Sequence, residues 1–289
     1  MNKNSIKAVV WFILSLIISV INDSITKLLS NSINSSTVVL WRFMFSTIIL
    51  LPIIPFYGFN IISTKKIGLH IARGAMLSLA ISLWAYGIKF VPISTVTLMS
   101  LTVPLFTVLM ANIFLKERIS TGTIFATIIG FTGCILTLSP SGIKISLIST
   151  VFIIASMLFA TLDILNKNLL NHGEKSMPML FYSNFFSGLF ALFIPGIDFS
   201  IKGYDMVLLF ILGVGANLIL FFLVRAFSLT QASLLAPIKY LELVISALVG
   251  FLLFGEGISF NILIGGAMII SSSLLIDRKI KLNGWKKRA

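Results

Sequence analysis

Two carboxylates lie inside apolar segments, each four residues before a lysine. Asp23 precedes Lys27 in INDSITKLLS, and Asp163 precedes Lys167 in ATLDILNKNLL. A spacing of four residues places both side chains on one face of a helix. A carboxylate in apolar surroundings needs a cationic or hydrogen-bonding partner, so we predict that each aspartate attracts a cationic group of a ligand. For Lys27, a structural role, as the partner of Asp23 with its ammonium snorkelling to the membrane surface, and a role at the substrate site remain equal alternatives.

A second group of polar residues occurs in APIKYLELVISAL, residues 236–248. Lys239 and Glu242 are three residues apart and share a helix face. They suit either substrate binding, which we favour, or a buried ion pair that fixes helix packing. Tyr240 lies between them, and we predict that its ring contacts a planar or cationic part of the substrate.

Arg42 and Trp84 complete the set of candidates. Arg42 suits either binding of a carboxylate or snorkelling near a helix end. Trp84 is a weaker candidate for ring contact, because tryptophan near the end of a membrane span is commonly an interfacial residue. The predicted substrate-binding residues are therefore Asp23, Arg42, Trp84, Asp163, Lys239, Tyr240 and Glu242.

The elements that position these residues must be membrane helices. The chain has 289 residues, of which 57% are hydrophobic and 11% charged, with a mean hydropathy of +1.06. Soluble domains carry about 25% charged residues, so this composition indicates an integral membrane protein. Spanning segments need about 20 apolar residues, and in lipid they must be helices or closed barrels. Ten helical spans are expected, at residues 8–29, 37–57, 68–88, 92–115, 122–139, 146–170, 178–197, 205–227, 233–254 and 259–277.

The basic residues predict the orientation of the spans. The net charge is +13, and six Lys and Arg residues occur in the tail, residues 278–289. Basic loops lie on the cytoplasmic side, and placing the N-terminus there puts most basic residues in cytoplasmic segments. We therefore expect both termini in the cytoplasm. The basic tail suits anionic lipid, and we expect no nucleic-acid binding.

The two halves of the chain resemble each other. The Asp-x-x-x-Lys pattern recurs after 140 residues, and residues 94–117 parallel residues 233–256. Two copies of five spans must have opposite orientations because five is odd, and inverted repeats are typical of secondary transporters. The sequence predicts an all-α membrane protein with one repeat at 8–139, an inverted repeat at 146–277 and a tail at 278–289. Lys239 and Glu242 have only Ser100 and Val103 as their equivalents, so this charge pair breaks the symmetry.

These features resemble the EamA modules of the drug/metabolite transporter superfamily. The motifs of the chain are also similar to those of the S-adenosylmethionine uptake branch found in obligate intracellular bacteria. The similar motifs are Asn22-Asp23, Arg42-Phe43-x-Phe45-Ser46, Arg73-Gly74 and Ala236-Pro237-x-Lys239-Tyr240-Leu241-Glu242.

The resemblance implies uptake of S-adenosylmethionine across the bacterial inner membrane, by exchange with S-adenosylhomocysteine and without a cofactor. Glu242 or an aspartate then meets the substrate's cations, and Lys239 or Arg42 its carboxylate. Proton coupling through Asp23 or Asp163 stays open as an alternative to exchange. An exporter of amino acids or other small metabolites of the same superfamily is the alternative function.

Several other features have expected structural roles. His70 and His172 are expected to be solvated or interfacial, and Glu117 and Glu256 to act as gates or helix caps. Glycines 130, 133, 265 and 266 suit close helix packing, and a homodimer through spans five and ten is one use of them. With two His, one Cys and no carboxylate cluster, the chain is not expected to be an enzyme or to bind a metal.

Overall fold

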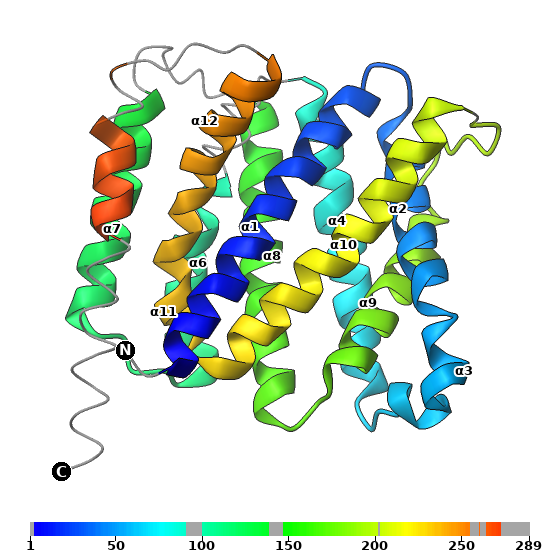
Figure 1. Ribbon diagram of the computed structural model, residues 1–289, viewed down its shortest axis with the longest axis horizontal. Coiled ribbons are helices and arrows are strands. Elements are labelled where there is room, and N and C mark those ends of the chain that lie inside the picture. Colours follow the sequence, from blue (N-terminus) through cyan, green and yellow to red (C-terminus); the bar gives the residue numbers. More distant parts are fainter. Residues whose placement is uncertain are drawn as a thin grey trace.

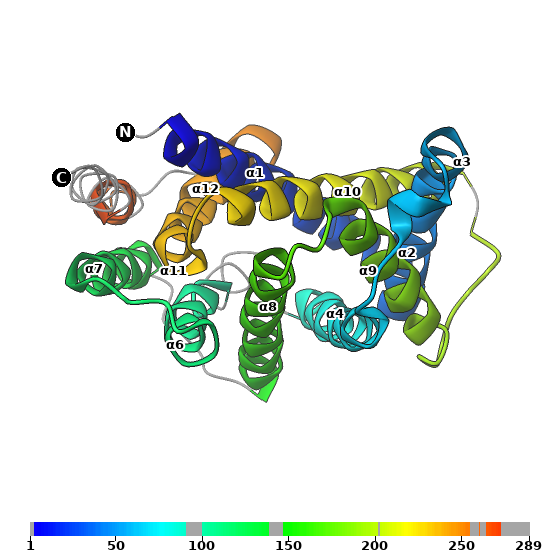
Figure 2. The same ribbon diagram turned by 90° about the horizontal axis from the view of Figure 1, so that it is seen from below.

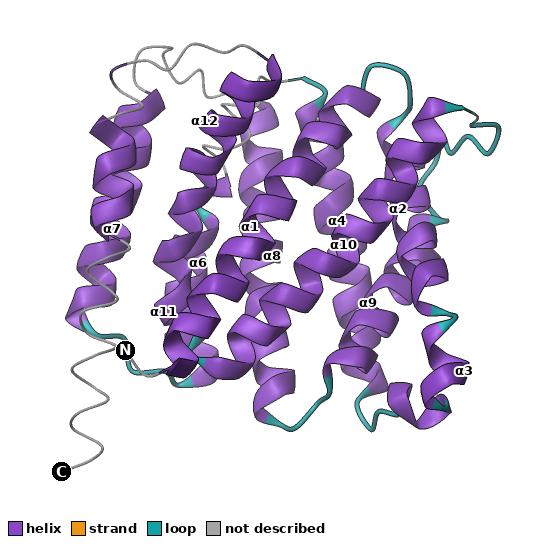
Figure 3. Cartoon of the chain, in the orientation of Figure 1, coloured by secondary structure: helices purple, strands orange, loops and turns teal. Residues whose placement is uncertain are grey.

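The computed structural model describes residues 3–90, 100–138, 147–201, 203–254, 260 and 264–272. The described residues form helices joined by turns, and no strand occurs among them (Figures 1 and 3). The elements are α1 (Lys3–Leu29), α2 (Ser35–Leu50), α3 (Ile53–Tyr57), η1 (Phe59–Ile62), α4 (Ile67–Ile88), α6 (Val103–Leu115), α7 (Thr121–Leu138), α8 (Leu147–Asn171), α9 (Ser176–Ala191), α10 (Tyr204–Leu229), α11 (Ala232–Leu235), η3 (Ala236–Tyr240) and α12 (Leu241–Phe254). Residues 264–272 form a further helical segment.

Each of the ten expected spans contains helix in this structure. Six segments of the described chain have the length and apolar character of membrane spans, and α6 and the first part of α7 are shorter apolar helices. Two spans are interrupted near prolines, because proline lacks an N–H and clashes with the preceding turn. Pro52 separates α2 from α3, and Pro237 lies in the 3-10 segment η3 between α11 and α12.

The helices form a ring, seen end-on in Figure 2. Helix α1 packs against α10 and α12, α10 against α2, and α9 against α2 and α4; α8 then connects α4 to α6, which reaches η3. Helix α7 lies at one edge of the molecule and contacts η3 (Figure 2). The elements of both halves therefore surround one central space.

Two helix contacts show that the halves are equivalent. Helix α4 meets α9 at Gly74, and α10 meets α2 at Gly213, where an added Cβ would overlap the partner helix in both cases. Ser187 Oγ donates to the Gly74 carbonyl at 3.0 Å, and Ser46 Oγ donates to the Gly213 carbonyl at 3.0 Å. Small residues allow such close approach between membrane helices. The same glycine–serine contact thus joins helix three of each half to helix two of the other.

The equivalent helices run in opposite directions. The turn after α1 lies at the top of Figure 1, whereas the turn after α8, its counterpart, lies at the bottom. Helices α4 and α10, the third span of each half, are likewise antiparallel (Figure 1). The predicted inversion of the two five-helix repeats is therefore confirmed.

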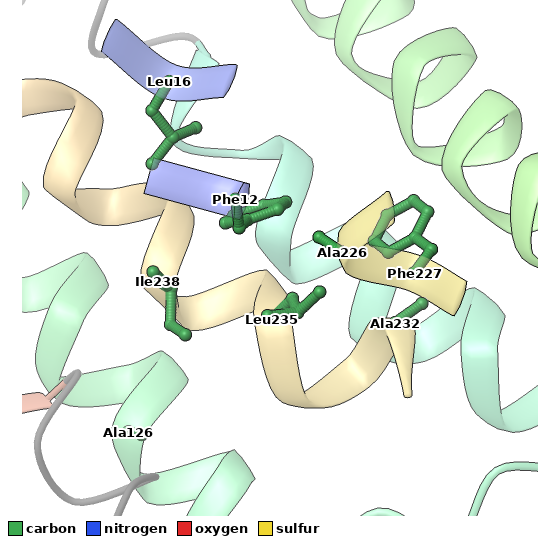
Figure 4. Packing of buried hydrophobic residues seen from close by; sticks show 8 residues of the cluster. All are labelled: Phe12, Leu16, Ala126, Ala226, Phe227, Ala232, Leu235 and Ile238. Carbon is green, nitrogen blue, oxygen red and sulfur yellow. The ribbon is translucent and has the colours of Figure 1, made fainter. Parts of the chain in front are cut away.

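Apolar packing holds the interrupted ninth span against its neighbours. The largest buried cluster joins Phe12 and Leu16 of α1 to Phe227 of α10 and to Leu235 and Ile238 of the ninth span (Figure 4). In lipid this packing acts through van der Waals contact rather than through exclusion of water. It fixes η3, and with it the residues that follow Pro237, against α1.

Candidate functional site

A cavity of about 170 Å³ lies inside the ring and is lined by both repeats. Its wall includes side chains from α1, α2, α4, α6, α8, α9, α10, η3 and α12. Six of the seven residues selected from the sequence are on this wall: Asp23, Arg42, Trp84, Asp163, Lys239 and Glu242. The structure brings them together from six different elements, so the cavity is the candidate substrate site.

Asp23 and Lys27 bind α4 rather than each other. Trp84 Nε1 donates to Asp23 Oδ1 at 3.2 Å, and one turn further along both helices Lys27 Nζ donates to the Ile88 carbonyl at 2.7 Å. A lysine at a carbonyl near a helix C-terminus is favoured by the helix dipole. Lys27 thus has a structural role at the end of α4, and Asp23 is left as the carboxylate of α1 that faces the cavity.

Repeat two uses the same arrangement at the opposite end of the ring. Lys167 Nζ of α8 donates to the carbonyls of Phe227 and Thr230 at 2.7 Å, where α10 ends. The Glu117 carboxylate nearby accepts hydrogen bonds from the N–H groups of Ala232 and Ser233, at 3.2 and 3.1 Å, and so caps the start of α11. The expected cap role of Glu117 is confirmed, and its counterpart Glu256 lies outside the described residues.

The charges on the wall interact with one another. Asp23 lies within electrostatic range of Glu242, Arg42 and Lys239. Asp163, from the other repeat, lies within range of Lys239 and Glu242. The wall therefore combines cations and anions, and both aspartates have a basic neighbour.

Glu242 has capacity for a further partner. Its Oε1 accepts a hydrogen bond from Ser19 Oγ at 2.9 Å, while Oε2 is buried and accepts none from the described residues. A buried carboxylate oxygen without a donor is costly. A cation or N–H group that enters the cavity would remove that cost.

Tyr240 does not lie where the sequence predicted. Its side chain is fully buried among Leu101, Leu243 and Ile269, on the side of the ninth span away from the cavity. A Cβ at Gly130 of α7 would lie 2.8 Å from Tyr240 Cε2, so this ring fills the contact with α7. The 3-10 turn rotates neighbouring residues by about 120°, and with Lys239 on the cavity wall, Tyr240 points elsewhere. The prediction of a substrate contact for this ring is corrected to a packing role.

His70 was expected to be solvated or interfacial, and that expectation is wrong. The imidazole is completely buried between Arg73 and Glu174, with Nδ1 3.2 Å from Arg73 Nη1 and Nε2 3.4 Å from Glu174 Oε1. Arg73 borders the cavity; it belongs to the Arg73-Gly74 motif but was not among the predicted substrate-binding residues. The helix that carries Arg73 is apolar like the other spans, and its acidic neighbour Glu174 lies far away in the sequence, in the turn between α8 and α9.

A pair of hydrogen-bonded asparagines, one of which lines the cavity, was also missed. Asn184 Nδ2 of α9 donates to Asn217 Oδ1 of α10 at 2.8 Å, and Asn217 Nδ2 donates to the Ser46 carbonyl of α2 at 2.8 Å. Asn184 lines the cavity beside Ser183. The feature of the sequence that could have identified this pair is the presence of asparagines inside apolar segments. Their network connects α2, α9 and α10 behind the wall.

Two of the glycines considered for a homodimer face partners within the chain. Gly130 meets Tyr240, and a Cβ at Gly133 would lie 2.9 Å from the Gly265 carbonyl. Close packing of α7 against residues 264–272 thus takes place inside one chain. These two glycines therefore do not support a dimer face.

The sequence model of the EamA-like transporter family matches the chain twice, over residues 6–139 and 146–277. The chain belongs to the EamA-like transporter family. The first match contains α1 to α7 and the second contains α8 to residues 264–272. Family membership, together with the helices, confirms the multi-span fold built from two repeats.

Similar proteins of known name are transporters. A Rickettsia conorii protein named "S-adenosylmethionine uptake transporter" is 37% identical over 275 residues, covering 95% of this EamA-like chain and 93% of the relative. A Rickettsia bellii protein with the same name is 38% identical, covering 92% and 91%. A Brucella anthropi "Riboflavin transporter" is 28% identical, covering 86% and 89%.

A solved crystal structure has the same fold. It superimposes with a TM-score of 0.75 at 14% identity, covering 95% of this EamA-like chain and 96% of its own. At this identity the likeness concerns the fold alone.

Proposed function

We propose that this protein is a secondary transporter that takes up S-adenosylmethionine across the bacterial inner membrane. The observation that carries the proposal is the cavity wall, which combines three acidic and three basic side chains drawn from both repeats (Asp23, Asp163, Glu242, Arg42, Arg73 and Lys239). Charges at membrane depth face the interior and mark substrate pathways. The name of the two Rickettsia relatives supplies the substrate.

The chemistry of this wall suits the substrate. S-adenosylmethionine carries a sulfonium, an ammonium, a carboxylate and an adenine ring. Glu242, with its unpartnered Oε2, is suited to a cation, and Asp23 and Asp163 provide further negative charge from opposite repeats. Trp84 makes edge-to-face contacts with Phe152 and Phe159, at centroid distances of 5.1 and 5.6 Å, and Trp84 and Phe159 line the cavity. The proposed adenine contact is this aromatic part of the wall.

Transport is proposed to follow alternating access and exchange. Inverted repeats permit two equivalent arrangements in which the cavity opens to opposite sides. S-adenosylmethionine has one net positive charge and S-adenosylhomocysteine has none. Each exchange then moves one positive charge inward, and about 2.3 kcal/mol is gained per 100 mV of inside-negative potential.

The proposed orientation places both termini in the cytoplasm. Lys167, Glu117 and the turn between α8 and α9 then form the cytoplasmic end of the ring, and Lys27 lies toward the outer end. The reaction of each terminus with a membrane-impermeant label, measured in intact cells, tests this arrangement. Labelling of either terminus from outside would contradict it.

The proposed transport unit is a single chain, because the repeats that enclose the cavity belong to the same chain. A homodimer through α7 would use its outward face, where Phe125 is 59% and Ile128 54% exposed. Such apolar side chains are equally suited to lipid. Dimerisation is therefore left out of the proposed mechanism.

Uptake of labelled S-adenosylmethionine into proteoliposomes tests the function. We expect uptake to require internal S-adenosylhomocysteine, to increase with an inside-negative potential and to resist competition by methionine, adenosine or riboflavin. Glu242→Gln and Asp23→Asn should abolish it, whereas Asp198→Asn, in an exposed loop, should not. Export of amino acids without exchange of S-adenosylmethionine would establish the alternative function.

A further inference from the structure

Arg73 is a cation on the cavity wall to which the proposed function assigns no group of the substrate. It lies on α4 with a side chain that is only 1% exposed to solvent, yet it borders the cavity. Next to it, Gly74 brings α4 against α9, which carries the cavity residues Ser183 and Asn184. Burying a guanidinium at membrane depth is costly unless it is paired or used.

The neighbours of Arg73 hold its side chain in place. A guanidinium only donates hydrogen bonds, so His70 Nδ1, 3.2 Å from Arg73 Nη1, must be the acceptor. The imidazole proton then lies on Nε2, which faces Glu174 Oε1 at 3.4 Å. Tyr182 of α9 packs near the imidazole, with ring centroids 5.3 Å apart, and Lys66 is a further charged neighbour. His70 therefore acts as a positioning residue between Glu174 and Arg73.

The three basic side chains of the wall differ in where their acidic neighbours lie. Arg42 interacts with Asp23, and Lys239 with both Asp163 and Asp23, all of which are on the wall. The acidic neighbour of Arg73 is Glu174, which is not among the cavity-lining residues.

Arg73 also has a hydrogen-bond donor without a partner among the described residues. Its one hydrogen bond to a described side chain or backbone group is the bond to His70, and its Nε has no partner among the described residues. A carboxylate that enters the cavity therefore meets no competition for Arg73 from an acidic side chain of the wall.

We infer that Arg73, held by His70 and Glu174, binds the carboxylate of the substrate's amino-acid moiety and makes the site selective for carboxylate-bearing substrates. A guanidinium binds a carboxylate through two parallel N–H···O bonds. Glu242 and the aspartates are then free for the substrate's cations. This assignment, which replaces Lys239 or Arg42 as the expected carboxylate ligand, rests on the proposed function.

A pair of ligands that differ only in the carboxylate tests the inference. Binding of S-adenosylmethionine and of its decarboxylated analogue to the purified full-length protein gives a selectivity ratio of dissociation constants. In the wild-type protein we expect the analogue to bind about ten-fold more weakly or worse, as for loss of a charge-assisted bond. In Arg73→Gln the ratio should fall to about one, and in Arg73→Lys to an intermediate value.

Matched variants separate this role from a structural one. Arg42→Gln should weaken both ligands by the same factor and leave the ratio unchanged. His70→Asn keeps an acceptor near the position of Nδ1 and should keep the ratio, whereas His70→Phe should lower it. If Arg73→Gln does not fold, the inference is tested by comparing the selectivity ratio of Arg73→Lys with that of the wild-type protein. Arg73→Lys keeps the charge beside Glu174.

The outcomes against the inference are distinct from failure of the proposed function. The role of Arg73 would be overturned, while S-adenosylmethionine binding stands, by any of three results. These are a wild-type selectivity ratio near one, an equal loss of affinity for both ligands in the Arg73 variants, and a loss of selectivity in Arg42→Gln instead. A wild-type protein that binds neither ligand would refute the proposed function, and the inference would fall with it.

Discussion

Replacing Gly74 and Gly213 by alanine, one at a time, tests whether the two repeats are packed equivalently. An alanine Cβ at Gly74 would lie 3.1 Å from the Ser187 nitrogen, and one at Gly213 would lie 2.9 Å from the Ser46 nitrogen, whereas ordinary contact begins at 3.4 Å. Each Cβ also meets the Cβ of a phenylalanine on the partner helix. Because backbone atoms block the space, the helices must separate.

The size of the effect follows from overpacking and from the serine hydrogen bond. Overpacking costs about 1–3 kcal/mol, and stretching an interhelical hydrogen bond adds about 0.6 kcal/mol. We therefore expect Gly74→Ala and Gly213→Ala each to lower the free energy of unfolding by about 2–4 kcal/mol. Ser187→Ala and Ser46→Ala remove only the hydrogen bond and should cost about 0.6 kcal/mol each.

Reversible unfolding of the purified protein in mixed detergent micelles measures these differences. Gly68→Ala is the matched control on α4, because no atom lies within 4 Å of an added Cβ there. The reasoning is refuted if the alanines at Gly74 and Gly213 are as harmless as the control. It is also refuted if one of them is severe and the other neutral, because the contacts are then not equivalent.

Three further variants address the ends of the ring and the cavity wall. Glu117→Ala leaves the start of α11 without its carboxylate acceptor and should lower the free energy of unfolding by about 3 kcal/mol. Glu117→Gln should lower it less, and equal effects of the two variants would contradict the cap. Lys27→Met and Lys167→Met each remove a charged donor from helix-terminal carbonyls and should each cost about 1–2 kcal/mol in the same unfolding assay, with no loss in either variant counting against that role. Trp84→Phe loses the hydrogen bond to Asp23 but keeps a ring, so it should weaken S-adenosylmethionine binding less than Trp84→Leu; the reverse order in a titration would remove the ring from the site.

The helices could be predicted from the sequence because lipid imposes a simple length and composition requirement. The inversion followed from the Asp23 and Asp163 patterns and from an odd number of spans. A kink of the ninth span at Pro237 was one interpretation of the sequence, but the break near Pro52 was not foreseen, because a proline is tolerated in a membrane helix when neighbours satisfy the freed backbone groups. Those neighbours are known only from the fold.

The charged residues of the site could also be predicted, because burying an ionisable group inside a membrane span costs enough free energy to indicate a function. The sequence could not give the direction of a side chain beside a break, and Tyr240 was misplaced for that reason. It could not pair His70 with Glu174 either, since contacts between distant segments depend on the packing of α4 against α8 and α9. Arg73 was named only as part of the Arg73-Gly74 motif and was not assigned to the site.

The claim on which the account depends is that the substrate occupies the central cavity. Ser15 of α1 lines that cavity, whereas Ile17 on the same helix is 36% exposed on the outer surface. Cysteine is introduced at each position in a Cys134→Ser background, and the rate of reaction with a small charged thiol reagent is measured with and without S-adenosylmethionine.

We expect S-adenosylmethionine to slow the reaction of Ser15→Cys by about ten-fold at a saturating concentration and to leave the reaction of Ile17→Cys unaffected. Equal rates at Ser15→Cys with and without bound S-adenosylmethionine would contradict the central claim.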